Sequence, residues 1–376
     1  MENRIDAKRE IMPDIDAQIQ EFEKELSTTK YNKRTQHHIG LVKAKIAALK
    51  DKKQVREKQK KAGIGYTIRK SGDATAVFLG FPSVGKSTLL NGLTNAKSEV
   101  AEYDFTTLGV IPGMLEYNNT KIQLLDVPGI VEGAASGRGK GREVLSVIRG
   151  IDLIVVVLDV THPGHRDIIL REVNEAGIRL NQKKPDVKIT KTAKNGIRIG
   201  KTVPLKMLDD PTIKDILKEF RINNADVLIR DRIDVDQLID AIEGNKAYIP
   251  GIVVLNKIDL ADPQKLEELK RAIKPDIIVS AKNKLNLEQL KEMIFKRIGF
   301  VRVYMKEQSK EPDMTMPAVL FEGATLHELC RKIHTSFINR FRFARIWGKS
   351  VKFPGQKIVK LSHQLKDDDV VELHLN

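Results

Sequence analysis

Residues 76–90, AVFLGFPSVGKSTLL, decide the fold of this 376-residue chain. An unbroken apolar run at 76–79 predicts a buried strand, because strands covered on both faces show continuous hydrophobicity. Gly80 through Ser87 then spell G-x-x-x-x-G-K-S, and a helical pattern follows directly. This strand–loop–helix order predicts a phosphate-binding loop, in which backbone N–H groups and a helix N-terminus face phosphate oxygens.

The residues of this loop have separate expected roles. Gly80 and Gly85 are expected to let the backbone turn tightly around a phosphate. Lys86 supplies a positive charge for β- and γ-phosphates, and the Ser87 hydroxyl is suited to bind Mg²⁺. The alternative is a glycine-rich turn that matches the pattern by chance. The strand before the loop and the helix after it argue against that alternative.

Composition limits the classes of protein that remain. A chain of 376 residues suggests two or three domains, and 41% hydrophobic residues suffice for globular cores. A net charge of +15 favours an anionic partner such as nucleic acid, with charge for solubility alone as the alternative. The single cysteine, Cys330, excludes an intramolecular disulfide. The N-terminal residues lack an apolar signal core, and no apolar run approaches the roughly 20 residues that span a bilayer. We therefore expect a cytoplasmic protein without a membrane partner.

Residues 1–61 predict a helical hairpin followed by a basic run. Apolar residues recur at spacings of three and four in two segments, separated by a polar break at 27–32. The basic run ends at Lys61 and is either a solvated helix face or a patch for RNA or the ribosome. The two apolar seams consist of Met12, Ile15, Ile19, Phe22 and Leu26, and of Ile39, Val42, Ile46 and Leu49.

Two further loops have the chemistry of a nucleotide switch. The segment YDFTTLG contains Thr106 and Thr107, and either threonine offers a hydroxyl that can reach Mg²⁺ and the γ-phosphate. Further along, an apolar strand ends in Asp126 and is followed by V-P-G. A carboxylate at such a strand end can hold Mg²⁺ through water, and the Gly129 N–H can approach the γ-phosphate.

The sequence VVLNKID at 253–259 predicts recognition of guanine. The Asp259 carboxylate can accept hydrogen bonds from guanine N1–H and from its 2-amino group, whereas adenine lacks this donor pair. Asn256 is expected to brace the loop, and the stem of Lys257 can lie over the base. A later strand runs into Ser280-Ala-Lys, a loop that commonly closes the base pocket.

The repeated strand–helix units predict a doubly wound α/β sheet that binds its ligand at the carboxyl ends of the strands. We expect this P-loop domain to span 62–299, interrupted by a small α+β insert at 176–248. Within the insert, Asn195-Gly196 lies between two alternating segments and predicts a β-hairpin.

Residues 300–376 predict a separate β-grasp-like domain, with strands around one amphipathic helix. Basic residues from Arg340 to Lys352 surround three aromatic residues in this domain. Such interleaving suits RNA contact, with sheet-core aromatics among solvated charges as the alternative. The aromatic residues are Phe341, Phe343 and Trp347.

With these motifs, the sequence resembles the Obg-related GTPases, and most of all the developmentally regulated GTP-binding protein family. The resemblance rests on GFPSVGKSTLL, YDFTTLGVIPG, LLDVPGIVEGA with its tail GRGKGRE, VLNKID and SAK, and on a C-terminal TGS-type domain. It implies Mg²⁺-dependent hydrolysis of GTP to GDP and phosphate, association with the ribosome or RNA, and a regulatory protein partner. It also implies that Ser87 and Thr107 ligate Mg²⁺, which favours Thr107 over Thr106.

The expected GTP site therefore combines five loops, with Asp126 reaching Mg²⁺ through water. No residue is assigned to orient the attacking water, because Ile130 stands where Ras-type enzymes carry Gln; Lys86 and Thr107 would assist catalysis. The residues expected to bind GTP are Gly80, Phe81, Pro82, Ser83, Val84, Gly85, Lys86, Ser87, Thr88, Phe105, Thr106, Thr107, Asp126, Val127, Pro128, Gly129, Asn256, Lys257, Asp259, Ser280, Ala281 and Lys282.

The role of K⁺ and the choice among three functions are left open by the sequence. K⁺ is a candidate cofactor in place of an inserted arginine, although potassium-using relatives carry Asn where this loop has Ser83. The main hypothesis is a slow GTPase switch acting on ribosomes or RNA. An RNA- or ribosome-binding module with a structural nucleotide is the first alternative, and an ATP-using P-loop kinase, which N-K-I-D disfavours, is the second.

Overall fold

The computed structural model describes residues 15–30, 32, 34–60, 71–94, 111–127, 150–205 and 208–376, with residues 54–60 described by backbone alone. These residues form two compact units. The smaller unit combines the N-terminal helices with residues 183–246, and the larger unit contains the other described residues.

The larger unit is built on a six-stranded sheet whose order is β11-β10-β4-β1-β3-β2. Neighbouring strands are parallel except for β2, which runs antiparallel to β3 at the edge. This order confirms the predicted doubly wound α/β fold. The strands are β1 (Ala74–Leu79), β2 (Ile111–Tyr117), β3 (Thr120–Asp126), β4 (Leu153–Asp159), β10 (Gly251–Asn256) and β11 (Ile277–Ile278).

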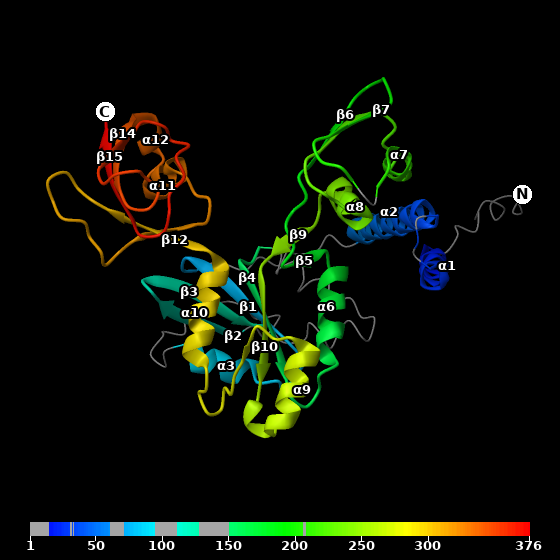
Figure 1. The fold of residues 1–376 in the computed structure, drawn as a ribbon, viewed down its shortest axis with the longest axis horizontal. Coiled ribbons are helices and arrows are strands. Elements are labelled where there is room, and N and C mark those ends of the chain that lie inside the picture. The colour runs from blue at the N-terminus through cyan, green and yellow to red at the C-terminus, as the bar shows by residue number, and fades with distance from the viewer. Residues whose placement is uncertain are drawn as a thin grey trace, which may run out of the picture. The chain divides into compact units, whose positions relative to one another are not determined.

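Two apolar layers sandwich this sheet, because successive residues of a buried strand point to opposite faces. Phe78 belongs to the layer under α3 (Lys86–Leu93) and α10 (Leu287–Ile298). Its neighbour Val77 belongs to the opposite layer, under α6 (His165–Glu175) and α9 (Pro263–Ile273). Figure 1 shows the two helix pairs on opposite sides of the sheet.

A short parallel pair of strands marks where the chain leaves the larger unit and returns. β5 (Ile178–Leu180) pairs with β9 (Ala247–Ile249), although about 70 residues lie between them. The Asn181 side chain donates to the Gly251 carbonyl at 3.1 Å and accepts from the Gly251 N–H at 2.7 Å. These bonds join the residue after β5 to the first residue of β10.

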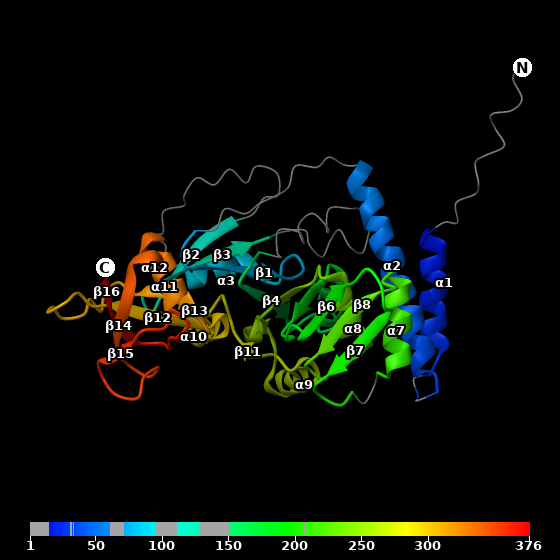
Figure 2. The ribbon, with the colours of Figure 1, turned by 90° about the horizontal axis from the view of Figure 1, so that it is seen from above.

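The smaller unit joins the predicted helical hairpin to the insert. α1 (Ile15–Thr28) packs on α2 (Gln36–Lys60) through Ile19, Val42 and Ile46. Figure 2 shows both helices beside α7 (Asp210–Glu219), and His37 Nδ1 of α2 lies 2.8 Å from Thr212 Oγ1 of α7. The insert also contains α8 (Val235–Glu243), β6 (Val187–Lys191), β7 (Ile197–Lys201) and β8 (Ala225–Ile229).

The β-hairpin predicted around Asn195-Gly196 is wrong. Both residues adopt positive φ, 83° and 68°, so the turn itself forms. However, the sheet order is β6-β8-β7, and β8 lies between the two strands that the turn connects. β8 takes the central place because Ala225, Val227 and Ile229 bury one face against the core of the insert. Tertiary burial thus overrides a local turn signal.

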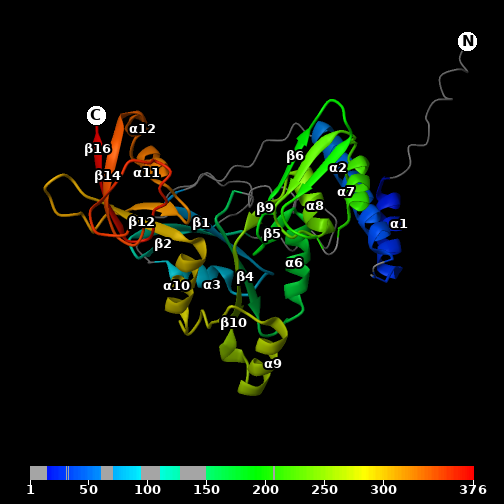
Figure 3. The same cartoon turned by 45° about the horizontal axis from the view of Figure 1, so that its top comes forward.

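The C-terminal domain is a five-stranded sheet around one principal helix, as predicted. The strand order is β13-β12-β16-β14-β15. Figure 3 shows α11 and α12 beside β12 and β14 of this domain. α11 begins at a capping box, in which the Thr325 N–H donates to the Glu328 carboxylate at 2.7 Å. Its elements are β12 (Phe300–Met305), β13 (Ala318–Phe321), α11 (Leu326–Ile333), α12 (Ser336–Arg340), β14 (Phe341–Trp347), β15 (Gln356–Ile358) and β16 (Asp369–Leu375).

Across the described part of the chain, no helix combines the length and apolar character needed to cross a bilayer.

Candidate functional site

At the carboxyl edge of the six-stranded sheet, the phosphate-binding loop meets Asp126 and the loops of Asn256 and Ala281. β3 ends at Asp126, which pairs with Phe78 near the end of β1. β10 ends at Asn256, which lies opposite Asp159, the last residue of β4. Because these strands are parallel, the loops that follow them emerge at the same edge, where doubly wound folds bind their ligands.

The two glycines of the phosphate-binding loop have different structural roles. A Cβ on Gly80 would lie 2.5 Å from the Val157 carbonyl oxygen, so close packing against β4 requires glycine here. Gly85 has a φ of +95°, and a Cβ there would lie 2.4 Å from Asn256 Nδ2. Gly85 therefore meets both a conformational and a steric requirement.

Lys86 opens α3 and folds back over the loop. Its ammonium group donates to the carbonyl oxygens of Gly80 at 3.1 Å and Phe81 at 3.0 Å, and the residue is 8% exposed. By contrast, Pro82, Ser83, Ser87 and Thr88 are exposed, while Val84 is buried beneath the loop. The positive charge of Lys86 thus lies beneath exposed residues of the loop, an arrangement that is suited to binding phosphate oxygens.

Ser87 and Asp126 form the part of the site that fits Mg²⁺. Ser87 Oγ donates to Asp126 Oδ2 at 2.5 Å, across 39 positions of sequence. Among the described residues, the buried Asp126 Oδ1 atom has no hydrogen-bond partner. A hydroxyl and a carboxylate supply the hard oxygen donors that Mg²⁺ prefers. Val127 is different, because its side chain packs in the core and leaves only backbone groups for a ligand.

Asn256 connects three of the loops. Its Nδ2 atom donates to the Val84 carbonyl of the phosphate-binding loop at 2.9 Å. Its Oδ1 atom accepts from the Ala281 N–H at 3.0 Å. The side chain is buried, at 1% exposure, so both bonds are shielded from water. Asn256 therefore fixes the spacing between the phosphate-binding loop and the loops expected to read the base.

The carboxylate of Asp259 lies at an open position beside the loop of Ser280. Asp259 is exposed, and its Oδ1 atom accepts from Ser280 Oγ at 2.5 Å. Ser280 is fully buried, and its hydroxyl also accepts from the Asn283 N–H at 3.2 Å. Ser280 thus orients the carboxylate of Asp259, the residue expected to accept from the base. Lys282, next in this loop, is exposed.

Several expected site residues lie outside the described residues, and the structure says nothing of them: Phe105, Thr106, Thr107, Pro128, Gly129 and Ile130.

One residue of this edge was missed by sequence reasoning. Asp159 is 4% exposed, and its Oδ2 atom accepts from Lys257 Nζ at 3.2 Å. Burial acts to raise the pKa of the Asp159 carboxyl, but hydrogen bonds from Thr161 and Lys257 outweigh burial and lower this pKa below its ordinary value. The available signal was an acidic residue directly after an apolar strand, the same pattern that marked Asp126.

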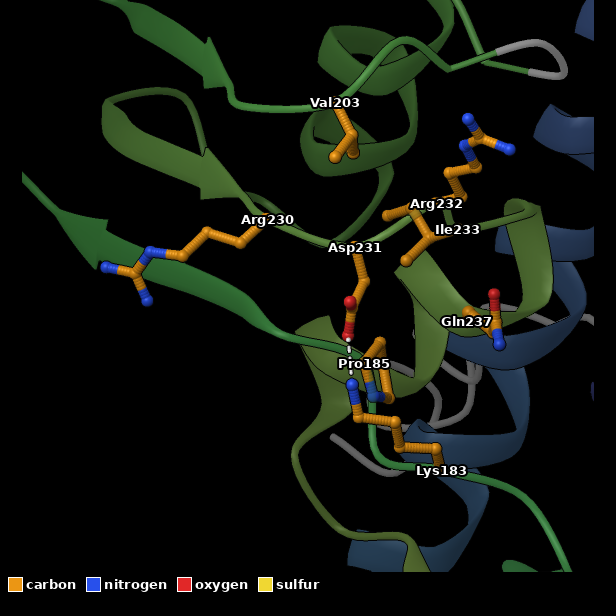
Figure 4. Close-up of a pocket in the computed structure, with 8 residues that line it drawn as sticks. All are labelled: Lys183, Pro185, Val203, Arg230, Asp231, Arg232, Ile233 and Gln237. Atoms are coloured by element: carbon orange, nitrogen blue, oxygen red, sulfur yellow. Dashed lines mark hydrogen bonds and ion pairs between the residues drawn. The ribbon is translucent and has the colours of Figure 1, made fainter.

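A hollow lies in the insert, lined by residues that include Lys183, Arg230, Asp231 and Arg232. Asp231 accepts from Lys183 at 3.3 Å and from the Asp186 N–H at 3.1 Å. Figure 4 shows the side chains of Arg230 and Arg232 extending in opposite directions. Their charges do not converge, so this hollow lacks the geometry of an anion site.

The fold and the loops at its carboxyl edge define a P-loop GTPase. Residues 75–192 match the family described as a 50S ribosome-binding GTPase, and residues 194–300 match the C-terminal region of that domain. Residues 301–375 match the TGS domain. Together these matches cover most of the described chain.

Similar proteins extend over nearly the whole length. An uncharacterised GTP-binding protein of Methanocaldococcus jannaschii is 50% identical, over 96% of this chain and 92% of its own. Developmentally-regulated GTP-binding protein 1 of Xenopus laevis is 44% identical, over 95% of this chain and 98% of its own. Developmentally-regulated GTP-binding protein 2 of Homo sapiens is 41% identical, over 94% and 98%. The chain belongs to the developmentally regulated GTP-binding protein family, as the motifs predicted.

Among solved structures, the YchF GTPase of Schizosaccharomyces pombe is similar, with a TM-score of 0.45 and 12% identity. The alignment covers 81% of this chain and 99% of that chain.

Proposed function

We propose that this protein binds GTP and GDP with Mg²⁺ and slowly hydrolyses GTP to GDP and phosphate, as a switch acting on ribosomes or RNA. The observation that carries the proposal is the set of Asn256 hydrogen bonds to Val84 and Ala281. They hold a phosphate-binding loop and a guanine-reading loop at one fixed spacing, as a guanine nucleotide requires.

Each part of the site has a role in this proposal. The Lys86 ammonium offsets negative charge on the β- and γ-phosphates, and Asp259 accepts from the base. Ser87, with Thr107, would hold Mg²⁺ directly and Asp126 through water; the ion would neutralise charge that develops on the phosphates. The phosphate-binding loop and α3 orient the triphosphate, so that water can displace GDP from the γ-phosphorus.

We expect hydrolysis by the isolated protein to be slow. Ile130 occupies the position from which Ras-type enzymes orient water, and an aliphatic side chain cannot form that hydrogen bond. A regulatory protein partner is the proposed means of raising the rate. K⁺ is a second proposed means, and a higher rate in potassium than in sodium chloride would support it. Equal rates of hydrolysis in the two salts would exclude K⁺ as an activator.

The C-terminal domain supports the ribosome or RNA part of the proposal. Phe341 packs with the core of this domain, whereas Phe343 and Trp347 carry cations on their rings. Lys357 Nζ lies 4.3 Å from the centre of the Phe343 ring, and Lys306 Nζ lies 4.9 Å from that of Trp347. The Phe343 ring also stacks on His374 at 4.1 Å, so these groups suit contact of their cations with phosphates rather than stacking of the rings on bases. The description of the matched family as ribosome-binding points the same way.

Sedimentation on ribosomes tests the switch. We expect more protein to pellet with ribosomes in a non-hydrolysable GTP analogue than in GDP, and we expect Lys86→Ala to abolish this difference. Association that ignores both the nucleotide and the Lys86→Ala change would instead favour the binding-module alternative, in which the nucleotide is structural. ATP outcompeting GTP for the site would revive the kinase alternative.

A further inference from the structure

Asp159 uses its two carboxylate oxygens for different tasks. Oδ1 accepts from three donors of the following turn: the Thr161 N–H at 3.0 Å, the Thr161 hydroxyl at 2.7 Å and the His162 N–H at 3.1 Å. Oδ2 instead accepts from Lys257 Nζ at 3.2 Å. An aspartate at a strand end often stabilises a turn as Oδ1 does here. The bond from Oδ2 to a distant lysine is not part of such a turn.

Lys257 combines an unfavourable backbone conformation with a side chain that the carboxylate of Asp159 holds in place. Its φ of 61° and ψ of 35° lie in the left-handed region, which is unfavourable for a residue with a Cβ. Its side chain is 30% exposed, whereas that of Asp159 is 5% exposed. A long, half-exposed lysine without a fixed partner would sample many rotamers. The buried carboxylate therefore restricts both the ammonium group and the methylene stem beside the base-reading loop.

The same turn also contacts the phosphate-binding loop. The rings of His162 and His165 stack at 4.9 Å, and the His165 ring stacks on Phe81 at 3.8 Å. The Phe81 carbonyl is one of the two that accept from Lys86. The turn that Oδ1 stabilises thus packs against Phe81 of the phosphate-binding loop. Oδ2 instead holds Lys257, which belongs to the loop expected to read the base.

We propose that Asp159 is a positioning residue for guanine nucleotide, because its Oδ2 atom holds the Lys257 stem where the base binds. This inference rests on the proposed function. It predicts that the ion pair contributes to binding of the base and contributes little to binding of the phosphates alone.

The variant Asp159→Asn separates the roles of the two carboxylate oxygens, because it removes the ion pair and keeps the turn. The amide oxygen can still accept from Thr161 and His162, so the turn and its support of Phe81 should persist. The amide NH₂ group then faces the Lys257 ammonium, and two donors cannot pair. We expect about tenfold weaker binding of GDP. The apparent affinity for inorganic pyrophosphate, measured by competition with a fluorescent GDP analogue, should stay within about twofold.

Asp152→Asn is a matched control. Asp152 immediately precedes the same strand, and its carboxylate accepts from the Thr75 N–H at 2.8 Å. The control makes the same chemical change at the opposite end of β4, and GDP binding should not change. Lys257→Met removes the ion pair from its other partner and should also weaken GDP binding about tenfold. In the double variant Asp159→Asn/Lys257→Met, the two losses should not add.

The outcomes separate this inference from the proposed function. Wild-type protein that fails to bind GDP would overturn the proposed function, and the inference with it. Wild-type binding together with unchanged affinity in Asp159→Asn or in Lys257→Met would overturn the inference alone. Equal losses of GDP and pyrophosphate binding, or additive losses in the double variant, would show that Asp159 has only a structural role. Either result would also overturn the inference.

Discussion

The Nδ2 atom of Asn256 donates a hydrogen bond to the carbonyl oxygen of Val84 at 2.9 Å, across 172 positions of sequence. Gly85, the residue after Val84, has no room for a Cβ because the same amide group would lie 2.4 Å from it. Direct contacts therefore fit the phosphate-binding loop to the loop expected to read the base, and such preorganisation reduces the cost of binding.

Replacing Asn256 should uncouple these loops. Asn256→Ala leaves the Val84 carbonyl and the Ala281 N–H buried without their partner, at a cost of about 1–3 kcal/mol. We expect GDP binding to weaken by roughly 10- to 100-fold, measured by titration with a fluorescent GDP analogue. Asn283→Ala changes an exposed side chain nearby and should leave the affinity unaltered. Wild-type affinity in Asn256→Ala would contradict this role.

Ser87→Ala should remove the response to Mg²⁺. The hydroxyl lies 2.5 Å from Asp126 and is the proposed direct ligand, so its loss should cancel the gain in GTP affinity that Mg²⁺ provides. Affinity measured in EDTA should be nearly the same in wild type and variant, which serves as the internal control. A variant that gains as much affinity from Mg²⁺ as wild type does would place the ion elsewhere.

Intrinsic hydrolysis should be slow. We expect a single-turnover rate of about 10⁻⁴ to 10⁻² per second, the range for GTPases without an inserted arginine or an equivalent activator. Rapid-quench measurement on the isolated protein, with Lys86→Ala as the inactive control, provides this rate. A rate far above the range would mean that the chain already contains a complete catalytic apparatus.

The C-terminal domain should lose stability in acid through one ion pair. Arg302 donates to both oxygens of Asp367, at 3.1 and 2.8 Å. Burial acts to raise the pKa of the Asp367 carboxyl, but the hydrogen bonds and charge of Arg302 lower this pKa below the ordinary 3.8. A lowered pKa means that the stabilisation is present above about pH 4 and is lost as the pH falls through the folded-state value.

Asp367→Asn should therefore lower the free energy of unfolding of this domain by about 1–2 kcal/mol at neutral pH. The difference from wild type should shrink below pH 4. Trp347, the single tryptophan, lies in this domain, so its fluorescence follows the unfolding. Glu311→Gln, at an exposed position, is the control. A difference between Asp367→Asn and wild type that is constant across pH would argue against the pair.

The sequence predicted β1, β3, β10 and β11 because each has an apolar run that leads directly into a recognisable loop. Short stretches of sequence were sufficient to predict these strands and loops, because the spacing of glycines and the residue that ends a strand can both be read within a few positions. The sequence did not predict the edge strand β2, whose residues IPGMLEY form no such run. Prediction also failed around Asn195-Gly196, where the turn formed but β8 entered between its strands. A turn signal contains no information about a strand that arrives about 25 residues later.

The site shows the same limit. Lys86, Asp126 and Asn256 were found because motifs fix their positions along the chain. Asp159 was missed because its partner, Lys257, is 98 positions away and is brought close only by the pairing of β4 with β10. The inward orientation of Val127 was missed because its burial depends on the packing of the opposite layer.

Calorimetry with purine nucleotides tests the central claim, that Asp259 selects guanine, most directly. Wild-type protein should bind GDP and should bind ADP and xanthosine diphosphate far more weakly. Xanthine carries a carbonyl oxygen in place of the 2-amino group of guanine, so the amide of Asp259→Asn should reverse the preference toward xanthosine diphosphate. Equal binding of ADP and GDP by wild type, or an unchanged preference for GDP in Asp259→Asn, would contradict the account.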